Sequence, residues 1–152
     1  FIRIAPELPN LHWTIIGDGQ DKLVFLEKLN VSGLLGSRIH YLGRKSHNEV
    51  LNTYSNYDFL CQFSRFETFS MVPAEAVLAG LPIIATYCGG PEFYLNESSA
   101  ILIDSEDNNA LEQSISRMYF SYQDFDLTET QNYIKANFSE EAVAEKLKGF
   151  YD

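Results

Sequence analysis

Short apolar runs rich in β-branched and aromatic residues alternate with longer segments of helical periodicity along this chain. Several of the short runs are nearly continuously apolar, as are strands covered on both faces. Five runs predict strands: Leu11–Gly17, Arg38–Leu42, Tyr57–Gln62, Leu81–Thr86 and Ala100–Ile103. The pattern therefore predicts a parallel sheet buried between layers of helices.

Apolar residues at helical spacing fill the segments between these strands, and Ser46 and Glu49 form a capping box at the start of one of them. After Ile103 only helices are expected, over roughly residues 106–122, 127–137 and 139–151. Strands that alternate with helices form right-handed βαβ units. The predicted fold class is α/β, a Rossmann-like three-layer α/β/α arrangement with a parallel sheet and C-terminal helices.

The composition narrows the possible functions. The 152 residues carry 11 Lys and Arg against 21 Asp and Glu, a net charge of −10, which disfavours non-specific nucleic-acid binding. No apolar run approaches the length of a membrane span. Cys61 and Cys88 have no partner spacing and are expected as small buried residues in a reducing, cytoplasmic compartment. No linker or repeat divides the chain, so residues 1–152 are interpreted as one domain.

Ligands of an open parallel sheet bind at the carboxyl ends of its strands. One such end precedes a helix for which Ser70 is the expected N-cap and Pro73 lies in the first turn. The first N–H groups of a helix have no intrahelical partner and attract phosphate. The N–H groups of Met71 and Val72 are therefore candidates for binding a phosphate.

Two carboxylates accompany this helix, with Glu67 before it and Glu75 in its second turn. An acidic pair beside an anion site is unfavourable unless the carboxylates accept hydrogen bonds from neutral groups, for which sugar hydroxyls are suitable. The alternative is that Glu75 complements the helix dipole while Glu67 is solvated. Spacing alone leaves both interpretations open.

Other motifs favour no further chemistry. Gly17–Gly19 lacks the third glycine of a dinucleotide fingerprint, and Asp18 is expected as a helix N-cap. His12, His40 and His47 have no metal-ligand spacing, so no metal site is expected. Neither a nucleophile elbow nor a P-loop is present in the sequence.

The segment from Glu67 to Glu75 resembles the Glu-x7-Glu motif of the retaining GT-B glycosyltransferases (glycosyl transferases group 1), which use nucleotide-sugar donors. Residues 79–86 and Gly89–Glu92 resemble the strand and the Gly-Gly-x-Glu loop that follow this motif in the family. Residues 13–19, 41–44 and 101–103 are also similar to family segments, in the same order. Nearly the whole chain thus resembles the C-terminal, donor-binding half of a GT-B fold.

The resemblance implies that Glu67 contacts the donor sugar near the reacting carbon and that Glu75 binds the ribose hydroxyls. It also implies that backbone N–H groups of Phe69, Ser70 and Met71 meet the diphosphate and the sugar.

The nucleobase would lie against the backbone at Gly43 and Arg44. The loop Gly89–Glu92 is one residue shorter than the commoner family form, and no role is assigned to Glu92.

One departure from the family concerns an Arg and a Lys that neutralise the donor diphosphate. No segment here matches that pair, and residues 1–6 look like the end of the helix that follows it. We expect the first strand and the acceptor-binding N-terminal domain to be missing as well. Without the Arg and the Lys, the donor diphosphate would lose charge-assisted hydrogen bonds of about 1.5–3 kcal/mol each. This chain alone is therefore expected to bind the donor weakly and to have no catalytic activity.

In the full-length enzyme the resemblance implies transfer of a sugar from a nucleoside-diphosphate sugar to an acceptor hydroxyl with retention, with Glu67 as the catalytic residue and no metal or cofactor. The expected acceptor is a glycan or lipid, as in cell-envelope polysaccharide biosynthesis, with membrane contact only through the missing half. The alternatives are a noncatalytic nucleotide-sugar-binding or regulatory module and a related nucleotide-sugar enzyme such as an epimerase.

Overall fold

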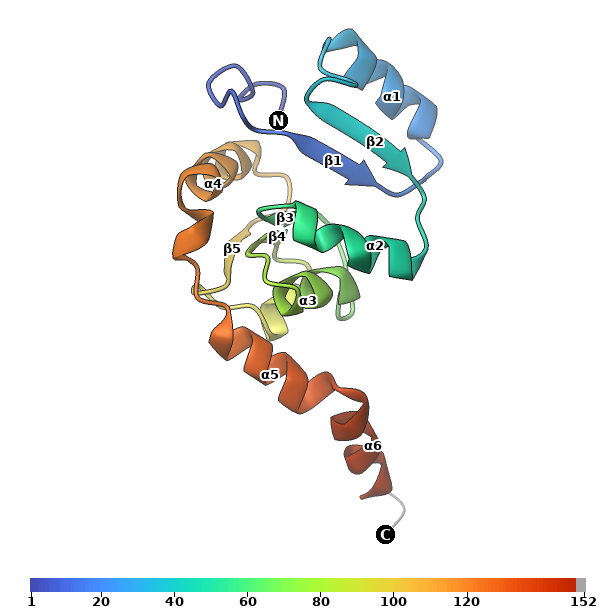
Figure 1. Ribbon diagram of the computed structural model, residues 1–152, viewed down its shortest axis with the longest axis vertical. Helices are drawn as coiled ribbons and strands as arrows, with labels where there is room; N and C mark the ends of the chain where they lie inside the picture. The colour runs from blue at the N-terminus through green and yellow to red at the C-terminus, as the bar shows by residue number, and fades with distance from the viewer. Residues whose placement is uncertain (150–152) are drawn as a thin grey trace. The chain divides into compact units, whose positions relative to one another are not determined.

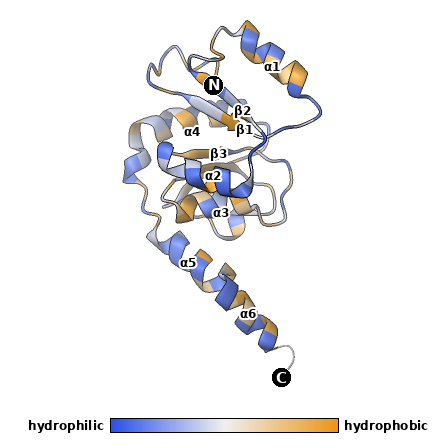
Figure 2. Ribbon diagram, turned by 45° about the vertical axis from the view of Figure 1, so that its right-hand side comes forward, coloured by the Kyte–Doolittle hydropathy of each residue, from blue (hydrophilic) through white to orange (hydrophobic). Residues whose placement is uncertain are grey.

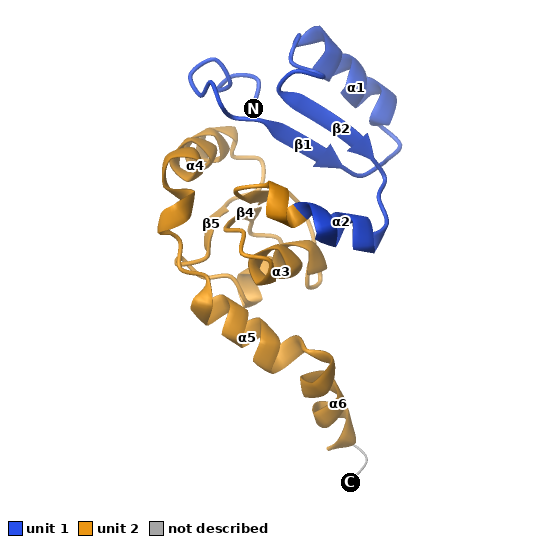
Figure 3. Ribbon diagram, viewed as in Figure 1, with its two compact units in different colours: residues 1–53 blue, residues 54–152 orange. Residues whose placement is uncertain are grey.

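The computed structural model describes residues 1–149 and divides into two compact units, Phe1–Thr53 and Tyr54–Asp152 (Figure 3). Each unit has its own parallel sheet with helices beside it. The predicted α/β, Rossmann-like fold class is confirmed. All five predicted strands are present, but hydrogen bonding divides them between a two-stranded and a three-stranded sheet.

The first unit is built on strands β1 (Trp13–Ile16) and β2 (Ile39–Gly43), which pair in parallel from Trp13 opposite Ile39. Helix α1 (Lys22–Val31) connects them and buries Leu29, and α2 (His47–Thr53) follows β2 (Figure 1).

Turns, rather than the expected end of a helix, form residues 2–7. The guanidinium of Arg38 holds this segment by donating to the carbonyl oxygens of Ala5 (2.5 Å) and Leu8. It also donates twice to the carbonyl oxygen of Leu11, at 2.8 and 3.0 Å. Because these acceptors lie 27 to 33 residues from Arg38 in sequence, one side chain anchors the N-terminal turns to the start of β2.

The second unit contains β3 (Leu60–Gln62), β4 (Ile83–Thr86) and β5 (Ala100–Ile103), paired in parallel in that order. Every residue of the central strand β4 is buried. Short 3-10 turns occupy Tyr54–Asn56, Pro91–Phe93 and Tyr122–Asp124.

Four helices complete this unit: α3 (Met71–Leu78), α4 (Asn108–Ser121), α5 (Thr128–Phe138) and α6 (Glu140–Lys148). Helix α4 packs on β5, and α5 packs on both α3 and α6. Many residues of α5 and α6 are hydrophilic, as the colouring of the ribbon in Figure 2 shows. None of the helices within residues 1–149 is long and apolar enough to cross a membrane.

Local capping follows the sequence in some places and departs from it in others. The capping box before α2 is confirmed, because the Ser46 N–H donates to Glu49 Oε2 (2.9 Å) and the Glu49 N–H to Ser46 Oγ (3.4 Å). The backbone N–H and hydroxyl of Ser46, together with Lys45, lower the pKa of Glu49 to about 2. Asp107 caps α4 with its side chain, so that helix begins two residues after the predicted start.

The expected N-cap role of Asp18 is wrong. The N-cap position of α1 is Asp21, whose side chain makes no cap hydrogen bond. The carboxylate of Asp18 instead accepts from the Gly19 N–H (3.0 Å) and pairs with Lys22 Nζ (3.2 Å). Three residues, Gly19 to Asp21, therefore separate Asp18 from the helix that it was expected to open. The two cysteines are free thiols, with Cys88 buried and Cys61 half-buried.

Replacing Arg38 with Met should destabilise the first unit by about 1.5–3 kcal/mol, because three carbonyl groups lose a charged donor. Trp13, the single tryptophan, lies in β1 and reports on this unit by fluorescence during urea unfolding. The matched control Lys28→Met removes an exposed cation from α1 and should cost less than about 1 kcal/mol. Equal losses for the two variants would contradict the anchoring role.

Candidate functional site

The loop that follows β3 places Glu67 beside the end of β4. Oε1 of Glu67 accepts hydrogen bonds from Ser64 Oγ (2.7 Å) and Gln62 Nε2 (3.3 Å). The Glu67 N–H donates to the carbonyl oxygen of Cys88 (2.9 Å). Both the backbone and the side chain of Glu67 are therefore fixed, and its carboxylate is half-buried rather than freely solvated.

The start of α3 lies immediately after this loop. Ser70 stands at the N-cap as predicted, but its φ of 65° is left-handed and its side chain caps no N–H group. Its carbonyl oxygen accepts from Tyr94 Oη (2.6 Å). An N-cap residue normally has an extended backbone that directs its side chain at the helix N–H groups, and Ser70 departs from that conformation.

Within the described chain, residues 1–149, the N–H groups of Phe69, Ser70 and Met71 have no hydrogen-bond partner. Met71 is also exposed, with a relative surface of 60%. The start of α3 therefore has three backbone donors without a partner among the described residues, and their binding of a ligand stays a prediction.

Glu75 lies one turn into α3, where it meets a buried tyrosine. The hydroxyl of Tyr54 lies 3.5 Å from Glu75 Oε2 and 3.3 Å from the carbonyl oxygen of Val72. Burial, followed by the charge of Glu75 and the hydrogen bond to it, raises the pKa of Tyr54 to about 12. Tyr54 is therefore a neutral phenol over the physiological pH range, and its one proton is shared between the Val72 carbonyl oxygen and Glu75 Oε2.

Two glycines of the loop after β4 approach the Glu67 segment. A Cβ atom on Gly90 would lie 2.9 Å from the backbone carbon of Phe69 and 3.0 Å from Glu67 Cβ. A Cβ on Gly89 would lie 3.1 Å from the Glu67 carbonyl oxygen, and its φ of +97° also favours glycine. These are contacts that a larger residue could not make without moving the backbone.

The first unit holds the remaining predicted residues. Gly43, with φ of 65°, ends β2, and its carbonyl oxygen accepts from the Gly17 N–H (2.9 Å). Tyr41 Oη donates to the Gly17 carbonyl oxygen (2.7 Å). Arg44 follows with an exposed side chain.

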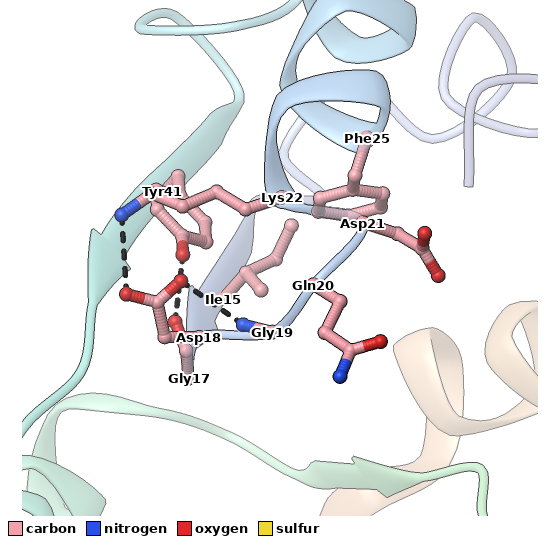
Figure 4. Close-up of a pocket in the computed structure, with 9 residues that line it drawn as sticks. All are labelled: Ile15, Gly17, Asp18, Gly19, Gln20, Asp21, Lys22, Phe25 and Tyr41. Carbon is pink, nitrogen blue, oxygen red and sulfur yellow. Dashed lines mark hydrogen bonds and ion pairs between the residues drawn. The ribbon is translucent and has the colours of Figure 1, made fainter.

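A pocket of about 320 Å³ opens between β1, β2 and the start of α1 (Figure 4). Lys22 and the Gly19 N–H lower the pKa of Asp18 at its rim. The lining residues are Ile15, Gly17, Asp18, Gly19, Gln20, Asp21, Lys22, Phe25 and Tyr41.

The structure thus brings Glu67, Phe69, Ser70 and Met71 together at the carboxyl end of β3, while Glu75 has a different set of hydrogen-bond neighbours. Gly43 and Arg44 belong to the other unit. Their roles toward a ligand stay predictions. Among residues 1–149 no group of three or more His, Cys, Asp or Glu side chains is arranged to hold a metal ion.

Sequence reasoning missed the side chains that hold the two carboxylates. Gln62 is the last residue of the predicted strand and Ser64 follows two residues later, and this position at a strand end was the one signal in the sequence that indicated them. Tyr54 and Tyr94 are buried aromatic residues, and nothing in their spacing indicates that their hydroxyl groups face Glu75 and Ser70.

Parallel sheets with flanking helices, and polar residues at the strand ends, define this chain as a Rossmann-like α/β protein. The model of the family "Glycosyl transferases group 1" matches residues 1–120, and the chain belongs to that family.

Among the curated relatives is the UDP-N-acetylglucosamine–peptide N-acetylglucosaminyltransferase GtfA subunit of Streptococcus parasanguinis, 26% identical over 157 residues that cover 95% of this chain and 30% of the relative. The chain spans about 30% of the length of the first curated relatives that it matches.

Solved structures share the fold. Sucrose-phosphate synthase from Thermosynechococcus elongatus aligns with a TM-score of 0.82 at 24% identity, over 99% of this chain and 40% of that one. HepE of Anabaena in complex with UDP-glucose aligns with a TM-score of 0.77 at 20% identity, over 97% of this chain and 44% of that one. The structural neighbours are glycosyltransferases of the GT-B type.

Replacing Gly90 with Ala should lower the stability of the second unit by about 1–3 kcal/mol, because the new methyl group meets backbone rather than a flexible side chain. Gly19→Ala is the control, since a Cβ there has no atom within 4 Å. Thermal unfolding followed by circular dichroism measures both. If Gly90→Ala melted at the wild-type temperature, the close contact would be disproved.

Stability at alkaline pH should depend on Tyr54. Because folding raises the pKa of Tyr54 to about 12, the folded state favours the neutral phenol. That stabilisation is complete below the ordinary tyrosine pKa near 10 and is lost as pH rises to about 12. Tyr54→Phe should therefore lose less stability over this interval than the wild type, measured by urea unfolding at several pH values. The exposed Tyr87, changed to Phe, is the control, and an identical pH dependence for Tyr54→Phe and the wild type would contradict the shift.

Proposed function

We propose that this chain is the donor-binding C-terminal domain of a retaining glycosyltransferase, which in the complete protein transfers a sugar from a nucleoside-diphosphate sugar to an acceptor hydroxyl. The observation that carries the proposal is the position of Glu67, held by Ser64 and Gln62 directly before a helix start with unpaired N–H groups. Membership of the glycosyl transferases group 1 family supports it.

The start of α3 would bind the diphosphate. The N–H groups of Phe69, Ser70 and Met71 lie at the positive end of the helix dipole and have no partner within residues 1–149. Such donors are already oriented before the reaction, so they stabilise a leaving diphosphate without the cost of reorganisation. In a chain of net charge −10, this local source of positive potential is what attracts an anion.

Glu67 would orient the donor sugar and stabilise the positive charge that develops at its anomeric carbon. Ser64 and Gln62 donate to Oε1 alone, which leaves Oε2 of Glu67 as the acceptor for a sugar hydroxyl. The proposed step is front-face transfer with net retention, in which Glu67 acts through charge and hydrogen bonding and forms no covalent bond to the sugar.

Glu75 would accept the ribose hydroxyls, with Tyr54 limiting the motion of its carboxylate. In the first unit, the backbone at Gly43 and Arg44 would meet the nucleobase. HepE, which shares the fold, has been solved with UDP and with UDP-glucose, and this supports a nucleotide sugar as the ligand.

The acceptor, a glycan or lipid in this proposal, would be bound by parts of the protein outside this chain, since the relatives that it matches are about three times longer. We propose a cytoplasmic location for the complete protein. Any contact with a membrane would be made by the parts of the protein outside this chain. The proposed reaction requires no metal or other cofactor.

Kinetics of the complete protein test the two roles separately. Glu67→Gln should lower kcat by about 10²–10³-fold with little change in KM, because it removes charge needed in the transition state. Glu75→Gln should instead raise the KM for the donor by about tenfold, because it weakens ground-state binding.

Glu141→Gln, an exposed change in α6, is the control and should leave both constants unchanged. Wild-type kinetics in both site variants would refute the proposal. Donor binding without turnover in the wild-type protein would instead favour the noncatalytic module. An inverted anomeric configuration of the product, measured by NMR, would exclude retention.

A further inference from the structure

Glu92, which has no assigned role in the proposed function, bonds back to its own loop. Its Oε1 accepts from the Gly89 N–H (2.7 Å) and its Oε2 from the Cys88 N–H (3.4 Å). Each carboxylate oxygen therefore holds a different backbone donor. Hydrogen bonds to an ionised acceptor are stronger than neutral ones, so this side chain restrains the loop after β4.

The charge of Glu92 persists at physiological pH. Burial raises the pKa of Glu92, but the N–H groups of Glu92, Gly89, Cys88 and Gly90 together outweigh that effect and lower it below the usual range. Several backbone dipoles thus converge on one carboxylate. The carboxylate of Glu92 thus occupies the N–H donors of its own loop and stays ionised at neutral pH.

The loop that Glu92 restrains is the one that touches Glu67. The carbonyl oxygen of Cys88 accepts the Glu67 N–H (2.9 Å), and Gly89 and Gly90 lie against the backbone of residues 67–69 without room for a Cβ atom. A shift of this loop would therefore move the backbone of Glu67. Ser64 and Gln62 restrain only the carboxylate of Glu67, so they cannot replace this contact.

We propose that Glu92 is a positioning residue, whose carboxylate holds the Cys88–Gly90 loop and thereby fixes the backbone of Glu67. This inference rests on the proposed function of Glu67 as the residue that stabilises the donor sugar. Glu92 touches no substrate in this account. Glu92 acts through its two hydrogen bonds to backbone N–H groups. Because Glu67 is proposed to stabilise the transition state, loss of Glu92 should lower kcat rather than weaken donor binding.

The experiment compares Glu92→Ala and Glu92→Gln in the complete protein. Glu92→Ala should lower kcat by about 10- to 100-fold with the KM for the donor changed less than about twofold, as a small displacement of a catalytic group does. Glu92→Gln keeps an acceptor oxygen but not the charge, and should show the same pattern with a smaller loss. This milder variant also gives a result if Glu92→Ala fails to fold.

Hydrogen exchange provides a readout that does not depend on activity. In Glu92→Ala the Glu67 amide should exchange faster than in the wild type, because its acceptor at Cys88 is no longer fixed. Glu97→Gln is the matched control, since Glu97 is exposed on the same connection and makes no hydrogen bond within residues 1–149. It should change neither kcat nor exchange.

Two results separate this inference from the proposed function. An inactive Glu67→Gln variant together with wild-type kcat in both Glu92 variants would overturn the positioning role alone. Full activity of Glu67→Gln would overturn the proposed function and the positioning role together. Unchanged exchange at the Glu67 amide in Glu92→Ala would also overturn the positioning role, whatever the kinetics.

Discussion

The candidate site depends on the contact between two loops that leave adjacent parallel strands. Gln62, the last residue of β3, pairs with Ala85, so β3 ends one residue before β4. Thr86 Oγ1 then donates to the Ser64 carbonyl oxygen (2.6 Å), and the Glu67 N–H donates to Cys88 (2.9 Å). Only glycine at positions 89 and 90 permits this approach. Glu67 and the start of α3 hold their places because the two backbones touch.

Neutral donors hold two of the acidic groups at this contact. Glu67 accepts from a hydroxyl and an amide, and Glu92 accepts from backbone N–H groups. Neutral donors satisfy a carboxylate without cancelling its charge, so these groups keep the ability to interact with a polar ligand. This arrangement suits a protein with a net charge of −10, in which positive potential at α3 comes from the helix backbone.

The strand predictions show where sequence patterns are reliable. Each observed strand ends within one residue of its predicted end, whereas three of the predicted starts are two or three residues early. Leu11 and Leu81, which precede β1 and β4, are buried without belonging to a strand. Because an apolar residue is buried in either case, its apolar character made the predicted strands begin too early. Because ligand sites follow strand ends, the predicted position of Glu67 did not suffer from these errors.

The sequence by itself determined the α/β class, the order of the elements, the capping box at Ser46 and the motif from Glu67 to Glu75, since each depends on residues close together in the chain. Tertiary structure alone decided the division into two sheets, the left-handed backbone at Ser70 and the partners of Arg38, Tyr54 and Glu92. Periodicity records which face of an element is apolar, but it carries no information on which distant backbone groups a side chain meets. Those partners exist only after the strands have paired and the loops have closed on one another.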